Sequence, residues 1–211
     1  WHELHVAVPG LPLARSRLLA GLLLRGRLAA GHPTGSNMVA VVVAQPLLAG
    51  PGDAELELRS EAQLQAWQRW AARSAEAIVG RLQSSHVKLL LSAGKQHEVL
   101  IYFAELYGIA VVEGLSPEEI TLLCKVTGVA PFTPECHDAQ GEVTDVAVAA
   151  FCQPLLLGSE RYVHLGFSST CAFQPHCLIL CGPAPGVIEQ HADSLQGAFK
   201  MLEQLSETVE Q

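Results

Sequence analysis

The sequence predicts an α/β fold in which short strands alternate with helices. The stretch from Val87 to Val129 carries most of this prediction. In it, two short apolar runs, 87–91 and 109–112, alternate with two segments whose apolar residues recur at helical spacing. Strands that alternate with helices are typical of βα units around a parallel sheet. A hydrophobic fraction of 49%, with only 16% charged residues, indicates that 211 residues can form a sizeable core.

Before this stretch, one strand and one long helix are expected. The strand covers 38–44 and follows a turn-rich loop at 31–37. The helix covers 60–84, opens with Ser60 as its N-terminal cap and has apolar residues at helical spacing along one side. Trp67 and Trp70 are expected to pack in the core rather than form an exposed aromatic patch.

The two central helices have clear boundaries. The first covers 95–107, with Val99, Leu100, Phe103 and Leu106 on one side, and Gly108 stops it. The second begins after Ser116, with Pro117 at its first position and acidic residues in its first turn, and Gly128 ends it.

After a polar connection at 133–144, the pattern changes to strands. Apolar stretches at 146–157 and 161–167 flank a hairpin turn at 158–160. A further strand is expected at 177–181, and a helix at 186–207. Residues 1–30 leave two alternatives open: a strand and a helix that connect to another domain, or a loose end.

Charge and length exclude some function classes. The net charge is −8 and the pI is about 5.5, which argues against a nucleic-acid or anionic-membrane surface. The most apolar run, 18–24, is too short for a membrane span, which needs roughly 20 residues. Because the chain does not start with Met, we expect it to be part of a longer protein.

No motif indicates catalysis, so the chain is expected not to be an enzyme. Ser92 and Lys95 fit an S-x-x-K pattern but lack its companion elements. A phosphate-binding P-loop would need Gly at Leu89 and Ser or Thr at Gln96. None of the six cysteines forms a C-x-x-C pair, and 135–138 (ECHD) is the one local cluster of metal-ligand types. We expect no metal site there, and reduced cysteines in the core.

The order of these elements and the residues at their turns resemble the apical domain of group II chaperonins. The matching stretches are KLLLSAGKQ (88–96), EVLIYFAELY (98–107), GIAVVE (108–113), EEITLLCKVTGV (118–129) and CLILCGP (177–183). Longer stretches at 161–176, 181–191 and 195–205 are similar to the chaperonin-like Bardet–Biedl syndrome proteins, a divergent branch of that family.

The resemblance implies a fold and a domain division. The fold would be a swivelling β/β/α domain with mixed sheets and flanking helices. Residues 1–30 would join an absent intermediate domain, and residues 31–211 would form the apical domain. ATP would bind only in the absent equatorial domain, because its "GDGTT"-type loop does not occur here, so no cofactor is expected in this chain. The short segment 48–53 stands where the family inserts its helical lid, so a full lid is in doubt.

The resemblance also implies a client-binding surface on the two central helices and the loops before them. Tyr102 is expected to be an outward aromatic anchor, with Gln96 and Glu98 as its polar rim. The alternative is a first helix that is apolar all round because it is buried on both sides. The candidate client-binding residues are Lys95, Gln96, Glu98, Ile101, Tyr102, Glu105, Glu118, Glu119 and Leu122.

The partners implied by the resemblance are other chaperonin-like Bardet–Biedl proteins and cytosolic chaperonin subunits. The clients would be subunits of the Bardet–Biedl coat complex, which carries membrane proteins to cilia. The location would be the cytoplasm, including the base of the cilium or the centrosome. One alternative is a structural module that only contacts neighbouring subunits. Another is a small-molecule site near Ser92 and Glu113, at the carboxyl ends of the strands.

Overall fold

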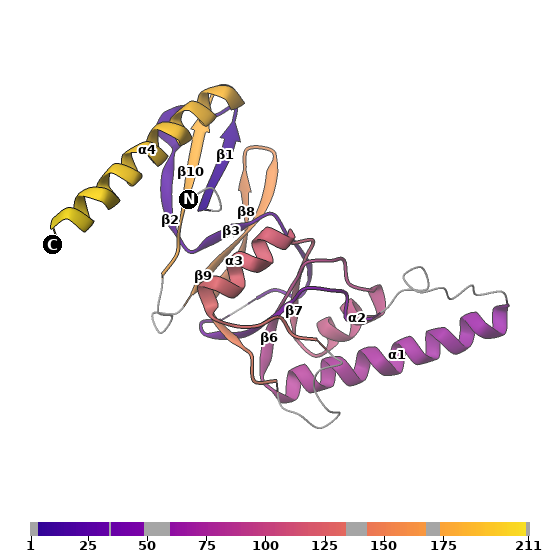
Figure 1. The fold of residues 1–211 in the computed structure, drawn as a ribbon. Coiled ribbons are helices and arrows are strands. Elements are labelled where there is room, and N and C mark those ends of the chain that lie inside the picture. The colour runs from indigo at the N-terminus through magenta and orange to yellow at the C-terminus, as the bar shows by residue number, and fades with distance from the viewer. Residues whose placement is uncertain (1–3, 34, 49–59, 134–142, 168–173, 210–211) are drawn as a thin grey trace.

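The computed structural model describes residues 4–33, 35–48, 60–133, 143–167 and 174–209. Within these residues the strands form two sheets, flanked by helices on several sides (Figure 1). The larger sheet has seven strands in the order β3-β9-β8-β5-β6-β7-β4, and the smaller has three in the order β1-β10-β2. Residues 49–53 of the predicted lid position 48–53, and the whole cluster 135–138, lie outside the described residues.

The centre of the seven-stranded sheet is parallel, as the sequence predicts. Strands β5 (Met38–Val43), β6 (Val87–Ser92) and β7 (Ala110–Glu113) pair in parallel. The hairpin β8 (Ala147–Leu157) and β9 (Glu160–Phe167) joins β5 in antiparallel register. The short strands β3 (Leu22–Leu24) and β4 (Arg27–Ala30) complete the two edges, also antiparallel. The sheet is therefore mixed, with flanking helices, and the predicted fold class is confirmed.

Helices cover both faces of this sheet. Alternate residues of a strand point to opposite faces. Ala40 and Val42 of β5 lie in one core with α3 (Pro117–Thr127), whereas Val41 and Val43 lie in another with α1 (Glu61–Ser84) and α2 (Glu98–Leu106). The helices α1 and α2 therefore share one face, and α3 covers the other.

The ends of the helices follow local sequence signals. Ser60 caps α1 by accepting a hydrogen bond from the Gln63 N–H. Ser116 and Glu119 form a reciprocal capping box at the start of α3. Gly128 ends α3 in the left-handed conformation that glycine adopts without strain. Helix α2 begins at Glu98 after the cap His97, later than the predicted residue 95.

The smaller sheet combines the start and the end of the described chain. It contains β1 (His5–Pro9), β2 (Arg17–Ala20) and β10 (His176–Gly182), with a 3-10 turn, η2 (Leu13–Arg15), before β2. The long helix α4 (Pro185–Val209) packs on β1 and β10 (Figure 1). Apart from the single turn η2, the regular elements within residues 5–30 are all strands, so the helix expected in this region as one alternative does not occur there.

The two sheets divide the chain differently from a boundary at residue 30. Strands β3 and β4 lie before residue 30 but belong to the seven-stranded sheet. Strand β10 lies near the other end of the chain but belongs to the three-stranded sheet. The predicted domain boundary itself stays a prediction.

Gly21 is the point at which the chain passes from β2 to β3, and so from one sheet to the other. Its φ of +100° lies in the region that favours glycine. A Cβ atom at this position would lie 2.3 Å from the Leu165 carbonyl oxygen, which is backbone and has little freedom to move. This crossing therefore requires glycine.

Candidate functional site

The loops before α2 and α3 meet at the carboxyl edge of β6 and β7. The Leu115 N–H donates to the Ser92 carbonyl at 3.1 Å, and the Gln96 N–H donates to Glu113 Oε2 at 3.0 Å. Neighbouring parallel strands end at the same edge, which brings these loops together although they are about 20 residues apart in sequence. Hydrogen bonds therefore link the loop before α2 to the end of β7 and the loop before α3 to the end of β6.

Gln96 is the centre of a buried hydrogen-bond network at this edge. Its side chain donates to Ser92 Oγ at 2.6 Å and accepts a hydrogen bond from the Leu47 N–H at 3.0 Å. The residue is only 5% exposed. The expectation that Gln96 forms an outward polar rim is therefore wrong, because both ends of its amide are satisfied inside the protein.

Glu113 completes this network as a buried carboxylate. It is 2% exposed, accepts the Gln96 N–H, and forms an ion pair with Arg27 of β4, whose side chain is largely exposed. A buried carboxylate needs a charged partner and further hydrogen bonds to offset the loss of hydration. Here Arg27 and Gln96 supply them, so Glu113 supports the architecture, and the small-molecule site considered for this edge gains no support.

Helix α2 has a buried side and an outward side. Leu100 and Ala104 are buried against the sheet. Four residues at helical spacing point away from it: Glu98, Tyr102, Glu105 and Leu106. Tyr102 is 62% exposed and Leu106 is 65% exposed. We call these four residues the α2 stripe.

The structure decides between two expectations for α2. The predicted outward position of Tyr102 is found, and a helix buried on all sides is not. Leu106, expected inside with Leu100, lies on the α2 stripe instead. Its position four residues after Tyr102 places both on one helix face, and this spacing could have predicted its exposure.

Helix α3 presents a different surface on the opposite face of the sheet. Leu122 is buried with Ile120 and Leu123, so it cannot contact a client without leaving the core. The Glu119 carboxylate is used internally, because it accepts hydrogen bonds from the N–H groups of Ser116 and Arg25. Glu118 is exposed, and hydrogen bonds from its own backbone and from Ser116 lower its pKa.

The predicted client-binding residues therefore do not form one surface. Lys95, Glu98, Tyr102 and Glu105 are exposed on or beside α2, with Ile101 half-buried among them. Glu118 and Glu119 lie with α3 across the sheet, while Gln96 and Leu122 are interior. The two helices share a loop edge but cover opposite faces, which the alternation of strands and helices alone could not reveal.

Helix α1, which packs against α2, carries two tryptophans in different environments. The Trp67 ring meets the His97 ring edge-to-face, with 5.2 Å between centroids. Trp67 is half-buried, whereas Trp70 is about half exposed. The expectation that Trp70 packs in the core is therefore wrong, because Ala71 and Ala75 occupy the buried side of α1.

Other observations concern catalysis, metals and membranes. Burial raises the pKa of the Cys152 thiol to about 12 and that of Cys177 to about 11, so neither is a thiolate near neutral pH. Among the described residues, no group of three or more His, Cys, Asp or Glu side chains could hold a metal ion. None of the described helices has both the length and the apolar character of a membrane span.

Comparisons with known proteins add the family relationship. No protein-family model matches the chain. The BBSome complex assembly protein BBS10 of Pongo abelii is 48% identical over 206 residues, which cover 96% of this chain and 28% of that protein. Its counterparts in Homo sapiens and Mus musculus are 47% and 43% identical over the same share of this chain.

The chain is homologous to one region of BBS10. It spans only 28–29% of the length of these curated relatives. The resemblance to the chaperonin-like Bardet–Biedl syndrome proteins is thereby confirmed.

The fold also agrees with the predicted resemblance to group II chaperonins. The open-state monomer of a group II chaperonin from Methanococcoides burtonii superposes with a TM-score of 0.69 at 16% identity. The superposition covers 92% of this chain and 42% of that one. The chain therefore has the fold of part of a group II chaperonin.

Proposed function

We propose that this chain is the apical, client-binding part of a chaperonin-like protein that helps to assemble the Bardet–Biedl coat complex. The α2 stripe is the client surface, with Tyr102 and Leu106 as its apolar anchors. Lys95, Glu98 and Glu105 form its charged surroundings. The relatives' name, BBSome complex assembly protein, supports this choice of client.

The observation that carries the proposal is the exposure of two large apolar side chains one turn apart on a firmly held helix. Interface hot spots are typically large side chains that become fully covered on binding. Exposed apolar groups cost little to bind when their support is already ordered, because less conformational entropy is lost. The buried network of Gln96, Ser92 and Glu113 supplies that order directly below the start of α2.

The proposal involves no catalytic step and no cofactor in this chain. The full protein would act with other chaperonin-like Bardet–Biedl proteins and with cytosolic chaperonin subunits, in the cytoplasm and at the base of the cilium. Any ATP would bind outside the region represented here.

The test compares two charge-introducing substitutions in the full-length protein. Tyr102→Glu places a charge on the α2 stripe, and Thr121→Glu places one on the exposed side of α3, across the sheet. In affinity capture from ciliated-cell lysate, Thr121→Glu should retain coat-complex subunits as the unchanged protein does. Tyr102→Glu should reduce the amount of these subunits retained by about tenfold or more. Both variants should have melting temperatures close to that of the unchanged protein, because both positions are exposed.

Equal retention by both variants, at unchanged melting temperature, would overturn the client-surface assignment. The domain would then be better described as a structural module that contacts neighbouring subunits. Loss with both variants would also contradict it, because the effect would not depend on the α2 face.

A further inference from the structure

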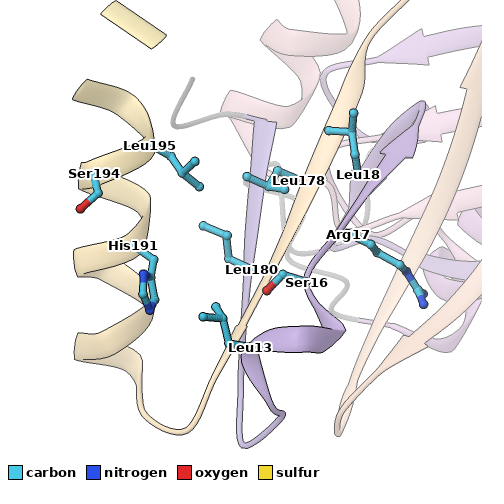
Figure 2. A pocket seen from close by; sticks show the side chains of 9 residues that line it. All are labelled: Leu13, Ser16, Arg17, Leu18, Leu178, Leu180, His191, Ser194 and Leu195. Carbon is cyan, nitrogen blue, oxygen red and sulfur yellow. The ribbon is translucent and has the colours of Figure 1, made fainter. Parts of the chain in front are cut away.

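Two exposed apolar surfaces among the described residues differ in chemistry. The first is a groove between α4 and β2 that is lined mainly by leucines (Figure 2). Aliphatic side chains attract apolar partners without directional preference, so this groove selects no particular chemistry. The second is the α2 stripe, where an exposed aromatic ring lies among carboxylates. That combination favours one class of partner side chain.

The ring of Tyr102 has a fixed neighbour and keeps a face open. It meets the Phe103 ring edge-to-face, with 5.4 Å between centroids and 76° between the ring planes. Phe103 is half-buried and packs against the core. In an edge-to-face pair at most one face of a ring is covered, and Tyr102 is 62% exposed. A partner therefore meets an open aromatic face, which attracts cations.

Two carboxylates flank this ring along the helix. Glu98 lies four residues before Tyr102 and Glu105 lies three residues after it, and both are exposed. Side chains three and four residues apart are neighbours on a helix surface, with about 5–6 Å between their Cβ atoms. Neither carboxylate forms an ion pair with any residue that the structure describes. Both are therefore available to a cation that lies over the ring.

The C-terminal end of α2 adds further negative charge. Backbone carbonyls at a helix C-terminus carry partial negative charge, which a basic residue in the last turn offsets. Helices α1 and α3 have Arg81 and Lys125 there, whereas α2 has no basic residue in its last turn. Glu105 lies in this last turn of α2 and makes it more negative. A cation from a partner would supply the missing charge.

Nearby cations of the chain restrict where a partner's cation can lie. Lys88 and His32 line a polar pocket of about 330 Å³ together with Glu105, and Lys88 would repel a cation inside it. Lys95, three residues before Glu98, weakens the attraction at the start of the helix. The favourable position is therefore outside the pocket and over Tyr102, with Glu105 as the stronger partner.

Arginine fits this arrangement better than lysine. Its planar guanidinium can stack on an aromatic ring and donate hydrogen bonds to a carboxylate at the same time, whereas the lysine ammonium is compact and more strongly hydrated. With 3.6 residues per helical turn, Glu98 and Glu105 lie on one flank of Tyr102 and Leu106 lies on the other. A guanidinium on the acidic flank therefore leaves Leu106, which is 65% exposed, free to contact an apolar side chain of the same partner.

We propose that the α2 stripe recognises an arginine of the client together with a large apolar residue beside it. The guanidinium lies on the Tyr102 ring and pairs with Glu105, with Glu98 as a second carboxylate. The apolar residue contacts Leu106. This recognition rests on the client function proposed for the α2 stripe and specifies the chemistry of the client segment.

Substitutions in the full-length protein separate the charged and aromatic contributions. In affinity capture from ciliated-cell lysate, Glu105→Gln should reduce the retained coat-complex subunits by about tenfold. Tyr102→Leu keeps an apolar side chain but no aromatic face, and should reduce retention similarly. Tyr102→Phe should retain several-fold more than Tyr102→Leu. The matched control is Glu189→Gln, at an exposed carboxylate of α4, which should retain as much as the unchanged protein. Because all three positions are exposed, the melting temperatures should stay nearly equal.

A photo-crosslinking amino acid at Leu106 then identifies the client residue. Mass spectrometry of the crosslinked coat-complex subunit should find an arginine within about four residues of the crosslinked site. Replacing that arginine by glutamine should reduce capture by the unchanged protein about tenfold. The same replacement should cause little further loss with Glu105→Gln, because the effects of two residues that contact each other are not additive.

Comparison with Tyr102→Glu separates this proposal from the client function itself. Loss of the subunits with Tyr102→Glu, but full retention with Glu105→Gln and Tyr102→Leu, would overturn arginine recognition and leave the client surface in place. Full retention with Tyr102→Glu as well would overturn both. A crosslinked site without an arginine near it, or additive losses from the client and Glu105 substitutions, would also overturn arginine recognition.

Discussion

At the scale of single residues, Gln96 differs most clearly from what its local sequence predicts. The sequence places it beside Lys95 at the start of a helix, where a polar side chain is usually solvated. In the structure it lies inside, because β6 ends at Ser92 and the chain turns back over the edge of the sheet. Its partners are Leu47, in the loop after β5, and Glu113, at the end of β7, and no local pattern in the sequence joins those positions.

Replacing Gln96 should therefore affect stability. Gln96→Leu removes the acceptor of the buried Leu47 N–H and should lower the free energy of unfolding by about 1–3 kcal/mol. The nearby exposed substitution Glu98→Gln should change it by no more than about 0.5 kcal/mol. Urea denaturation of both variants measures the difference. Equal stabilities would mean that the Gln96 network contributes nothing to folding.

At the scale of elements, the sequence predicted most boundaries because their signals are local. The cap at Ser116, the stop at Gly128 and the hairpin turn at 158–160 depend on residues within one or two turns of each other. Which face a helix covers depends instead on the whole sheet. This is why α2 and α3 were expected to act together and are found on opposite faces.

The start of α3 allows a pH prediction. Hydrogen bonds lower the pKa of Glu118, so its ionised form is favoured in the folded state. Its stabilising contribution is therefore present above the ordinary value of 4.5 and is lost as the pH falls through the lowered pKa. Glu118→Gln should be less stable than the unchanged protein at pH 7.

Thermal unfolding across a pH series measures this effect. The two melting curves should converge below the lowered pKa, where Glu118 is protonated in both the folded and the unfolded state. A difference in melting temperature between the two proteins that stays constant over the whole acid range would contradict the assigned role of the Glu118 charge at the N-terminus of α3.

At the scale of the whole molecule, the two sheets are joined through Gly21. Gly21→Ala should lower the free energy of unfolding by more than about 2 kcal/mol, because the added Cβ meets the Leu165 carbonyl and φ at this position is positive. Gly197→Ala, in the middle of α4 with open space around it, should instead stabilise the helix by about 0.5–1 kcal/mol. Chemical denaturation of both variants gives the comparison. A mild effect of Gly21→Ala would show that the crossing between the sheets can shift to relieve the clash.

The division into two sheets was the least predictable part of the fold. Strands β1 and β2 come from one end of the chain and β10 from the other, and β2 and β3 are separated by the single residue Gly21. Apolar periodicity identifies strands but not their partners, since pairing over more than 150 residues leaves no local pattern.

The parallel pairing of β1 with β10 has a mechanical consequence. Residues His5–Pro9 run alongside Leu178–Gly182 in continuous register, so the first strand and one of the last lie side by side and point the same way. Tension applied to the start of β1 and the end of α4 would load these hydrogen bonds in shear, all at once, rather than unzip them one by one. Force that reaches this region from the rest of a longer protein would therefore be borne first by β1 and β10, and the seven-stranded sheet could stay folded under load.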